Sequence, residues 1–333
     1  MMSAPRIGAT PRPRRATAGF AGPGAGTAAL LDAGTVPRPR RGGVPVLSRP
    51  AGAPPAATAA SAWLPGAPCT PRTCVESGRA VTDLPRAVLR LVSLLVVVVA
   101  GITLIPLVGR IPAAPRDRLV RKWCRTIVRA AGVRVRTTGA APPTGGLLLV
   151  ANHISWLDIP LLAAVRPGRM LAKAEIRQWP VAGALTAGSG ALFIERDRLR
   201  ALPGTVERIA DILREGAAVA VFPEGSTWCG RARGPFRRAV FQAALDAGVP
   251  VQPVRLHYRR EEGTVTTAPA FVGDDSLLAS VWRVVSVRGL VADVCVQPVL
   301  PPGGAPDRRS LALTAERATT HRVSANSQAH RHF

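Results

Sequence analysis

The sequence has 333 residues, enough for one large domain with appendages or for two small domains. Its formal net charge of +24 is typical of chains that bind nucleic acid or an anionic membrane surface. All 44 basic residues are Arg except Lys122 and Lys173, a bias typical of a GC-rich genome, so part of the charge reflects codon supply. The chain has a single Tyr, and its arginines are not interleaved with a pattern of aromatic residues on which bases could stack. This argues against a nucleic-acid binder.

The cysteines, five in all, are odd in number and scattered along the chain. Cys69 and Cys74 lie in a Pro-rich segment with no second pair to complete a zinc site, and Cys124, Cys229 and Cys295 are isolated. We therefore expect free thiols in a reducing compartment, and no bound metal.

Residues 1–85 are dominated by Ala, Gly, Pro, Arg and Thr, and no hydrophobic periodicity persists. This composition predicts a disordered extension that buries no core. A later start is the open alternative, at a GTG valine codon for Val75 or Val81, because no methionine lies between Met2 and Met170.

The segment 86–110 contains an uncharged apolar run, LVSLLVVVVAGITLIPLVG, with arginines on both flanks. A helix needs about 20 apolar residues to cross a hydrocarbon core of about 30 Å, whereas the apolar region of a cleavable signal peptide has roughly 7–15. We expect a membrane anchor helix here. A buried core helix is the alternative, and Pro106 leaves open a kinked, re-entrant form.

Residues 111–300 have the alternating strand and helix patterns of an α/β domain. They predict a largely parallel β-sheet flanked by helices, with functional groups beyond the carboxyl ends of the strands. A C-terminal tail follows at 301–333. The expected strands are 133–139, 146–152, 169–173, 190–196, 217–225 and 249–258. The expected helices are 118–132, 156–164, one between 173 and 190, 205–214, 238–246 and, in the tail, 310–319.

The stretch NHISWLD places His153 and Asp158 five positions apart, directly after an expected buried strand. One interpretation gives Asp158 only a capping role, with Ser155 at the helix N-cap, and makes His153 a satisfied loop histidine. In the other, Asp158 holds one imidazole nitrogen and the second nitrogen accepts a proton as general base. The chain has no G-x-S-x-G elbow, so the activated hydroxyl would belong to a substrate.

The stretch VFPEGSTWCG runs from an expected strand into a turn that offers Glu224, Gly225, Ser226 and Thr227. Turn amides followed by arginines suit a phosphate or another anionic head group. A solvated turn before an arginine-rich helix is the alternative. The arginines that follow are Arg231, Arg233, Arg237 and Arg238.

NHISWLD, FIER, FPEGST and VPVQPV, in this order, resemble the lysophospholipid acyltransferase family, typified by 1-acylglycerol-3-phosphate acyltransferase, in a form of actinobacterial type. The resemblance covers about residues 91–300. The family pattern K-x-x-L-x3-P-x2-G and I-x-R is also matched, by Lys173, Ile176, Pro180, Gly183, Ile194 and Arg196.

This resemblance implies a glycerolipid acyltransferase-like fold, with His153 as catalytic base and Asp158 as its partner. Lys173 would lie near the reacting groups. An acyl-CoA or acyl-carrier protein would be the donor substrate, with no cofactor and no metal. Residues implied to hold the acceptor are Arg196, Glu224, Gly225, Ser226 and Thr227, and Pro250 and Pro253 would support the acyl pocket.

Two departures concern the acceptor. The family commonly has Arg two positions after the Gly of F-P-E-G, where this chain has Thr227, and F-K-x-G is replaced by residues 236–239, FRRA. We expect acyl transfer to 1-acyl-glycerol-3-phosphate, giving phosphatidic acid, at the cell membrane with the catalytic domain on the cytoplasmic side, although arginines on both flanks of the apolar run leave the orientation ambiguous. The alternative acceptor is lyso-ornithine lipid, and a non-catalytic lipid-binding protein is a remote alternative.

Overall fold

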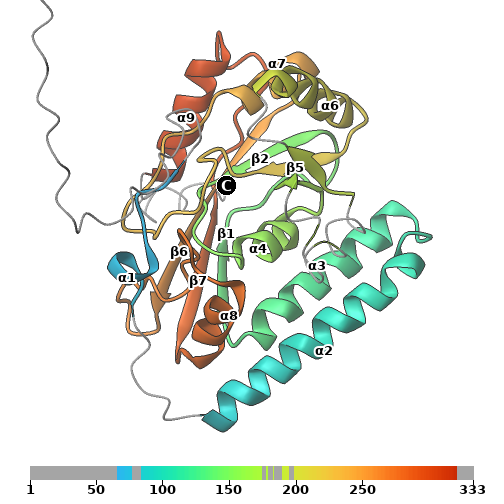
Figure 1. The fold of residues 1–333 in the computed structure, drawn as a ribbon. Coiled ribbons are helices and arrows are strands. Elements are labelled where there is room, and N and C mark those ends of the chain that lie inside the picture. The colour runs from blue at the N-terminus through green and yellow to red at the C-terminus, as the bar shows by residue number, and fades with distance from the viewer. Residues whose placement is uncertain are drawn as a thin grey trace, which may run out of the picture. The chain divides into compact units, whose positions relative to one another are not determined.

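The computed structural model describes residues 66–76, 84–174, 178, 183, 190–194 and 199–320 (Figure 1). Most of the expected disordered extension lies outside these residues. So does the helix expected between Lys173 and Gly190, apart from single positions, and so do residues 321–333.

The described strands form one sheet in the order β1-β7-β6-β2-β5-β3-β4. Neighbouring strands are parallel except β6 and β7, so the expectation of a largely parallel sheet is confirmed. The strands are β1 (Arg134–Thr138), β2 (Leu147–Ala151), β3 (Arg169–Lys173), β4 (Leu192–Ile194), β5 (Ala218–Val221), β6 (Val251–Arg260) and β7 (Leu290–Val296).

Two elements beyond the sequence prediction follow β6. Helix α8 (Leu277–Ser286) and strand β7 return the chain so that β7 pairs antiparallel with β6 and parallel with β1. The alternating pattern of the preceding strands and helices gave no signal for this reversal, because an added antiparallel strand interrupts the regular βα repeat.

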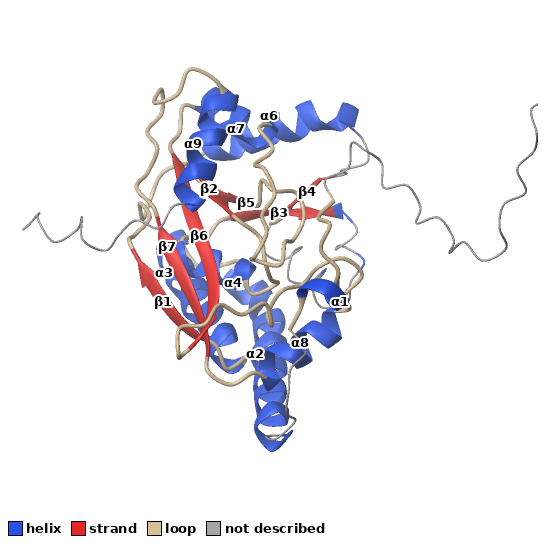
Figure 2. Cartoon of the chain, turned by 90° about the vertical axis from the view of Figure 1, so that its left-hand side faces the viewer, coloured by secondary structure: helices blue, strands red, loops and turns tan. Residues whose placement is uncertain are grey.

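Helices cover both faces of the sheet, as expected (Figures 1 and 2). In β2, Leu147, Leu149 and Ala151 belong to one apolar core, and Leu148 and Val150 to the other, because successive side chains point to opposite faces. The first core is closed by α3 (Ala113–Ala130), α4 (Asp158–Val165) and α8, and the second by α6 (Leu202–Arg214), α7 (Ala239–Ala247) and α9 (Arg308–Thr320). A short 3-10 turn, Leu199–Ala201, leads into α6.

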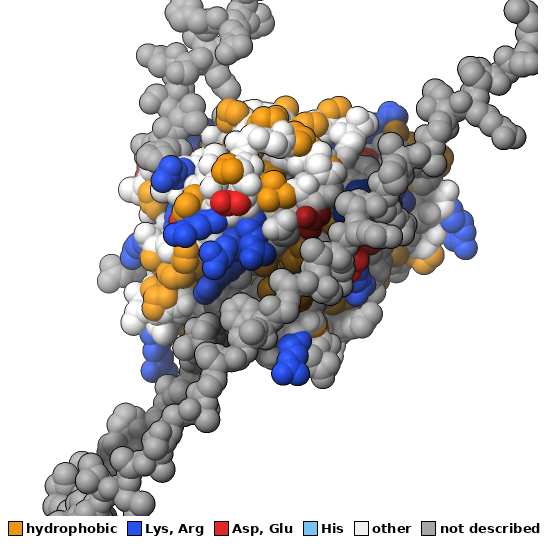
Figure 3. Space-filling view, turned by 90° about the horizontal axis from the view of Figure 1, so that it is seen from above, with side chains coloured by type: hydrophobic (Ala, Val, Ile, Leu, Met, Phe, Trp, Pro, Cys, Tyr) orange, Lys and Arg blue, Asp and Glu red, His pale blue; other side chains and the backbone are white. Residues whose placement is uncertain are grey.

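The tail contributes to the second core. The helix predicted at 310–319 is present as α9, and it buries Leu311, Ala312 and Ala315 beside α7. Figure 3 views the chain from the end at which α6, α7 and α9 lie, where Lys and Arg side chains gather next to apolar ones.

Helix α2 (Leu84–Val108) is the apolar helix predicted from the sequence, and by length and composition it could cross a membrane. It lies along α3 (Figure 1): the indole Nε1 of Trp123 donates to the carbonyl of Val97 at 2.9 Å, and the Trp123 ring covers Gly101 so closely that a Cβ there would collide with it. Arg90 donates to the carbonyls of Val285 and Val287 at the end of α8. One side of α2 is therefore packed on protein, while much of its apolar surface is exposed.

The segment 66–76 corrects the predicted boundary at residue 85. It contains the short helix α1 (Pro71–Cys74), and its Cys69 is buried in the first core. Glu76 accepts a hydrogen bond from the Thr266 hydroxyl at 2.7 Å and pairs with Arg231 at 3.0 Å. Composition alone misjudged this segment, because the apolar core residues, the Thr266 hydroxyl and the Arg231 guanidinium that hold it lie far away in the sequence.

Candidate active site

His153 follows the carboxyl end of β2, which lies between β5 and β6 in the sheet. The preceding Asn152 fixes this point: its Nδ2 donates to the carbonyl of Leu256 at 3.0 Å, and its Oδ1 accepts from the Leu256 N–H at 2.8 Å. The chain therefore leaves the sheet in a defined direction, beyond the strand ends where sites form in such folds.

The His153 ring and the Asp158 carboxylate meet. Nδ1 of His153 lies 2.9 Å from Oδ2 of Asp158, and the Asp158 side chain is completely buried, whereas that of His153 is 18% exposed. A carboxylate only accepts hydrogen bonds, so Nδ1 carries the proton and donates it. Nε2 is then the nitrogen with a free lone pair, which can accept a proton from a hydroxyl.

Asp158 also organises the turn, but not as the predicted capping box, because the helix N-cap is Leu157 rather than Ser155 and Asp158 is the first helical residue. Its Oδ2 accepts from the backbone N–H groups of Ile154 at 2.6 Å and Ser155 at 2.8 Å, and the Ser155 hydroxyl accepts from the N–H of Leu157 at 3.3 Å. The helix begins at Asp158, two residues later than predicted, because residues 156 and 157 form the turn that brings the carboxylate back.

Tyr258 is a site residue that the sequence analysis did not identify. Its buried hydroxyl donates to Oδ1 of Asp158 at 2.6 Å, so both carboxylate oxygens are engaged. Burial and the neighbouring carboxylate raise the pKa of Tyr258 well above its usual value, which keeps it a donor. The available signal was weak: Tyr258 is the single tyrosine, at the end of an alternating strand.

The loop after β5 packs against His153 from the other side. The Phe222 ring stacks on the imidazole with ring centroids 3.9 Å apart and an interplanar angle of 10°. The N–H of Trp228 donates to the carbonyl of His153 at 2.8 Å. The ring is therefore held by a carboxylate at one edge and an aromatic face, which fixes its orientation.

Glu224 supports the backbone of the same turn. Its Oε2 accepts from the N–H of His153 at 2.7 Å and its Oε1 from the N–H of Gly234 at 3.3 Å, and the residue is 3% exposed. Burial raises the pKa of Glu224 to about 7, although these two donors and Arg233 act in the opposite direction. Its predicted role was to hold the acceptor, whereas its hydrogen bonds here link two backbone segments.

The other turn residues lie beside Glu224. Gly225 has φ of 78°, a left-handed conformation that favours glycine. Ser226 has a buried hydroxyl for which the described residues provide no hydrogen-bond partner. Thr227 is half-buried.

Of the two predicted substrate-binding cations, Lys173 is described by its backbone alone and Arg196 is not described. Lys173 is the last residue of β3, and its backbone is in register with Ile194 of β4. Arg196 lies outside the described residues. Both predicted acyl-pocket prolines lie at β6: Pro253 is opposite Val150 of β2, and the carbonyl of Pro250 accepts from the Leu148 N–H at 3.1 Å.

The arginines after Glu224 have different environments. Arg231 is paired with Glu76 and exposed. Arg233 is half-buried, donates to the carbonyl of Thr319 at 2.7 Å, and lies near both Glu224 and Arg255. Burial and the positive charge of Arg255 lower the pKa of Arg233. Among the described residues, Nε of Arg255 is buried without a partner.

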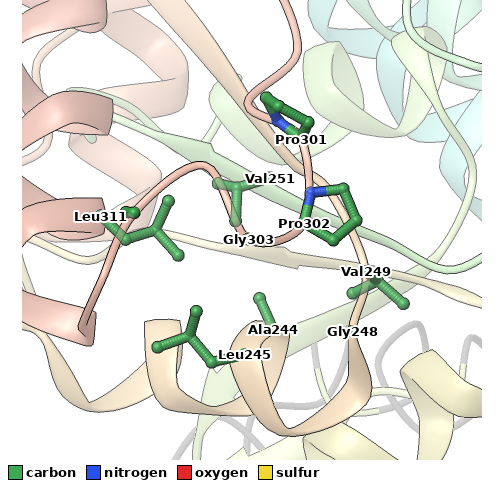
Figure 4. Close-up of a pocket in the computed structure, with 10 residues that line it drawn as sticks. Ala244, Leu245, Gly248, Val249, Val251, Pro301, Pro302, Gly303 and Leu311 are labelled. Atoms are coloured by element: carbon green, nitrogen blue, oxygen red, sulfur yellow. The ribbon is translucent and has the colours of Figure 1, made fainter.

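The small apolar hollow in Figure 4 is separate from this site. It has a volume of about 150 Å³ and lies between α7, the start of β6 and the turn at Pro301–Gly303. Val251 at its wall is opposite Leu148, near the start of β2, whereas His153 follows the other end of that strand. The hollow therefore lies at the opposite edge of the sheet from the His153 ring.

Comparison with known proteins places this arrangement in a family. The family model described as Acyltransferase matches residues 132–257, which include His153, Asp158 and Glu224 and end one residue before Tyr258. A lyso-ornithine lipid O-acyltransferase of Pseudomonas aeruginosa is 40% identical over 245 residues, covering 70% of this chain and 92% of that protein. A 1-acyl-sn-glycerol-3-phosphate acyltransferase of Neisseria meningitidis is 36% identical over 197 residues, covering 59% of this chain and 77% of that protein.

A solved structure gives the same fold. The crystal structure of the 1-acyl-sn-glycerophosphate acyltransferase PlsC from Thermotoga maritima matches with a TM-score of 0.53 at 20% identity, covering 71% of this chain and 92% of that one. With a relative at 40% identity over most of its length and the family model spanning the His153 turn, the chain belongs to the lysophospholipid acyltransferase family and is an acyltransferase.

Proposed function

We propose that His153 is the general base that deprotonates the free hydroxyl of a lysolipid, which then attacks an acyl thioester. The observation that supports this most directly is the 2.9 Å contact between Nδ1 of His153 and the buried carboxylate of Asp158. It assigns the proton to Nδ1 and leaves Nε2 as the acceptor. The carboxylate also stabilises the imidazolium that forms when the hydroxyl loses its proton.

In this mechanism the acyl group passes directly from the thioester to the acceptor hydroxyl, without a covalent enzyme intermediate. The acceptor oxygen bonds to the thioester carbon while its proton passes to Nε2 of His153. The tetrahedral oxyanion collapses, the carbon–sulfur bond breaks, and the leaving thiolate of coenzyme A or acyl carrier protein takes the proton from the imidazolium. Backbone N–H groups of the loop after β5, or Lys173, would stabilise the oxyanion.

The acceptor we favour is 1-acyl-glycerol-3-phosphate. Arg233 and Arg255 are close enough for their charges to interact, and Arg233 is half-buried. Two neighbouring cations removed from water repel each other, and a bound phosphate relieves that repulsion with charge-assisted hydrogen bonds. Glu224 balances only part of this charge, because its pKa is raised to about 7.

Lyso-ornithine lipid is the second candidate, and two observations favour it. Thr227 replaces the family's arginine, and the relative in Pseudomonas aeruginosa is a lyso-ornithine lipid O-acyltransferase. The carboxylate of ornithine is also an anion, so the same arginines would have a partner. What differs is the amino group, which a site built for phosphate would not favour.

We further propose that α2 and α3 attach the enzyme to the membrane surface. The outer side of α2 exposes apolar side chains, while α3 exposes Arg118, Lys122, Arg125 and Arg129 at helical spacing on one face. An apolar surface beside a basic one suits an anionic lipid interface. Because α2 packs on α3 and α8, a position within one leaflet accounts for the contacts better than a span surrounded by lipid. The catalytic domain would then face the cytoplasm, where the donors are.

The test is a direct competition of acceptors. Purified enzyme in mixed micelles receives lysophosphatidic acid and lyso-ornithine lipid at equal concentration, with labelled acyl-CoA in one arm and labelled acyl-carrier protein in the other. We expect phosphatidic acid as the main product. A clear preference for lyso-ornithine lipid would overturn the first choice of acceptor, and no transfer to either would contradict the proposed activity.

Variants locate the head group in the same assay. Arg233→Gln should raise the acceptor KM at least about tenfold, because a charge-assisted bond contributes about 1.5–3 kcal/mol, and the donor KM should change little. Arg208→Gln, at an exposed position of α6, is the control. Thr227→Arg should improve the use of lysophosphatidic acid, and an unchanged preference would argue against a phosphate beside that turn.

A further inference from the structure

Three cysteines form a cluster that acyl transfer does not use. The Sγ atoms of Cys69, Cys74 and Cys229 all lie within 4.8 Å of one another. Cys69 and Cys229 are each 4% exposed, and Cys74 is half-buried. From the sequence these were expected to be unrelated thiols; the fold brings them together.

Both sides of the cluster are held in place by other contacts. Cys69 precedes α1 and Cys74 ends it, with the Thr70 side chain accepting from the Thr73 N–H at the start of the helix. The carbonyl of Cys69 lies against Gly273, where a Cβ would come within 3.0 Å of it. Cys229 lies in the loop that follows β5. The three sulfurs are therefore brought together by the packing of the segment 66–76 on the rest of the protein.

We propose that Cys69, Cys74 and Cys229 bind a zinc ion as thiolates. Zinc–sulfur bonds of about 2.3 Å in a tetrahedron place sulfur atoms roughly 3.8 Å apart, so small side-chain rotations would complete the site. Cys69 and Cys74 are separated by four residues, within the spacing of about two to four that is typical of paired zinc ligands.

Three sulfurs that meet in a largely buried cluster can all act as ligands of one metal ion. A divalent cation supplies the charge that makes several neighbouring thiolates stable, and its binding releases their protons to solvent.

The number of sulfurs favours zinc over a disulfide. A disulfide would join two of the three cysteines and leave the third unexplained, whereas zinc uses all of them. Zinc usually takes four ligands. Within the described part of the chain no further His, Cys, Asp or Glu joins the group, so the fourth ligand in our proposal is a water molecule beside Cys74, the most exposed of the three.

Such a zinc ion would link the segment 66–76 to the loop that follows β5, which packs against His153. Cys229 directly follows Trp228, whose N–H donates to the carbonyl of His153 at 2.8 Å. The ion would thus fix the loop that carries Glu224 while remaining outside the acyl-transfer chemistry. Its presence is independent of which lipid the enzyme acylates.

The test measures metal directly on the full chain. The protein is expressed with added zinc, purified in detergent without chelators, and analysed by inductively coupled plasma mass spectrometry; we expect about one zinc per chain. Cys69→Ser, Cys74→Ser and Cys229→Ser should each lose most of it. Cys124→Ser and Cys295→Ser, which change cysteines outside the cluster, are matched controls that should keep it.

Cobalt provides a second readout that does not depend on activity. Metal-free protein titrated with Co²⁺ should develop thiolate-to-cobalt charge-transfer absorption and tetrahedral d–d bands, and zinc should abolish both. The proposal would be overturned if the purified wild-type protein contained no zinc and its metal-free form developed none of these bands with Co²⁺. A disulfide within the cluster, found by alkylation and mass spectrometry, or equal zinc loss in the control variants would also overturn it. Because the wild-type chain is measured first, a variant that fails to fold does not obscure the result.

Discussion

Replacing Asp158 by Asn separates its two roles. The carboxylate accepts from His153 Nδ1 and from the N–H groups of Ile154 and Ser155 through Oδ2, and from the Tyr258 hydroxyl through Oδ1. With its amide oxygen at the Oδ2 position, Asn keeps the first three bonds, and the Tyr258 hydroxyl can turn to accept from the amide nitrogen. The geometry survives, while the negative charge that stabilises the imidazolium is lost.

The expected loss in kcat/KM is roughly 10- to 150-fold, since a hydrogen bond to a charged group contributes about 1.5–3 kcal/mol and about 1.4 kcal/mol corresponds to a factor of ten. The free energy of unfolding should fall much less than in Asp158→Ala, which leaves buried donors unpaired at about 1–3 kcal/mol each. The assay combines initial rates of labelled acyl transfer with thermal unfolding followed by circular dichroism.

Two controls make the result decisive. Asp211→Asn changes a half-exposed helix carboxylate that pairs with Arg214 at 2.6 Å, and it should leave kcat/KM unchanged. His153→Ala should reduce turnover by about 10²–10⁴-fold, the usual share of general-base catalysis. Wild-type kcat/KM in folded Asp158→Asn would refute the role of the carboxylate charge, and near-normal turnover in His153→Ala would refute the base itself.

Further predictions concern stability, the membrane and the acceptor. The pKa of Glu224 is raised from 4.5 to about 7, so its native state binds the proton more tightly; this stabilising contribution is complete below 4.5 and is lost as pH rises through 7. The wild-type melting temperature should therefore fall over this window relative to that of Glu224→Gln, and parallel pH profiles would contradict the raised pKa. Val96→Glu, at a position of α2 that is 60% exposed, should reduce flotation with anionic liposomes, whereas Leu313→Glu on α9, 43% exposed, should not. Arg196→Ala should raise the acceptor KM at least about tenfold, with little change for the donor, if this cation binds the head group.

Local patterns in the sequence determined most of the architecture. The continuous apolar run at 147–151 and the helical spacing in 205–214 predicted elements that are present as β2 and α6. Parallel strands made a site at their carboxyl ends the natural expectation, and NHISWLD placed a histidine and an aspartate there. The partnership of His153 with Asp158 could be anticipated because a single turn joins them.

Contacts between distant residues were decided only by the tertiary structure. Tyr258 reaches Asp158 across 100 positions, and Glu224 reaches the N–H of His153 across 71, because β6, β2 and β5 are neighbours in the sheet. The segment 66–76 looked unable to pack, since its partners are the loop around Thr266 and the cysteine at 229. Periodicity and spacing report only on residues close in sequence, whereas strand order and loop packing depend on the burial of the whole chain.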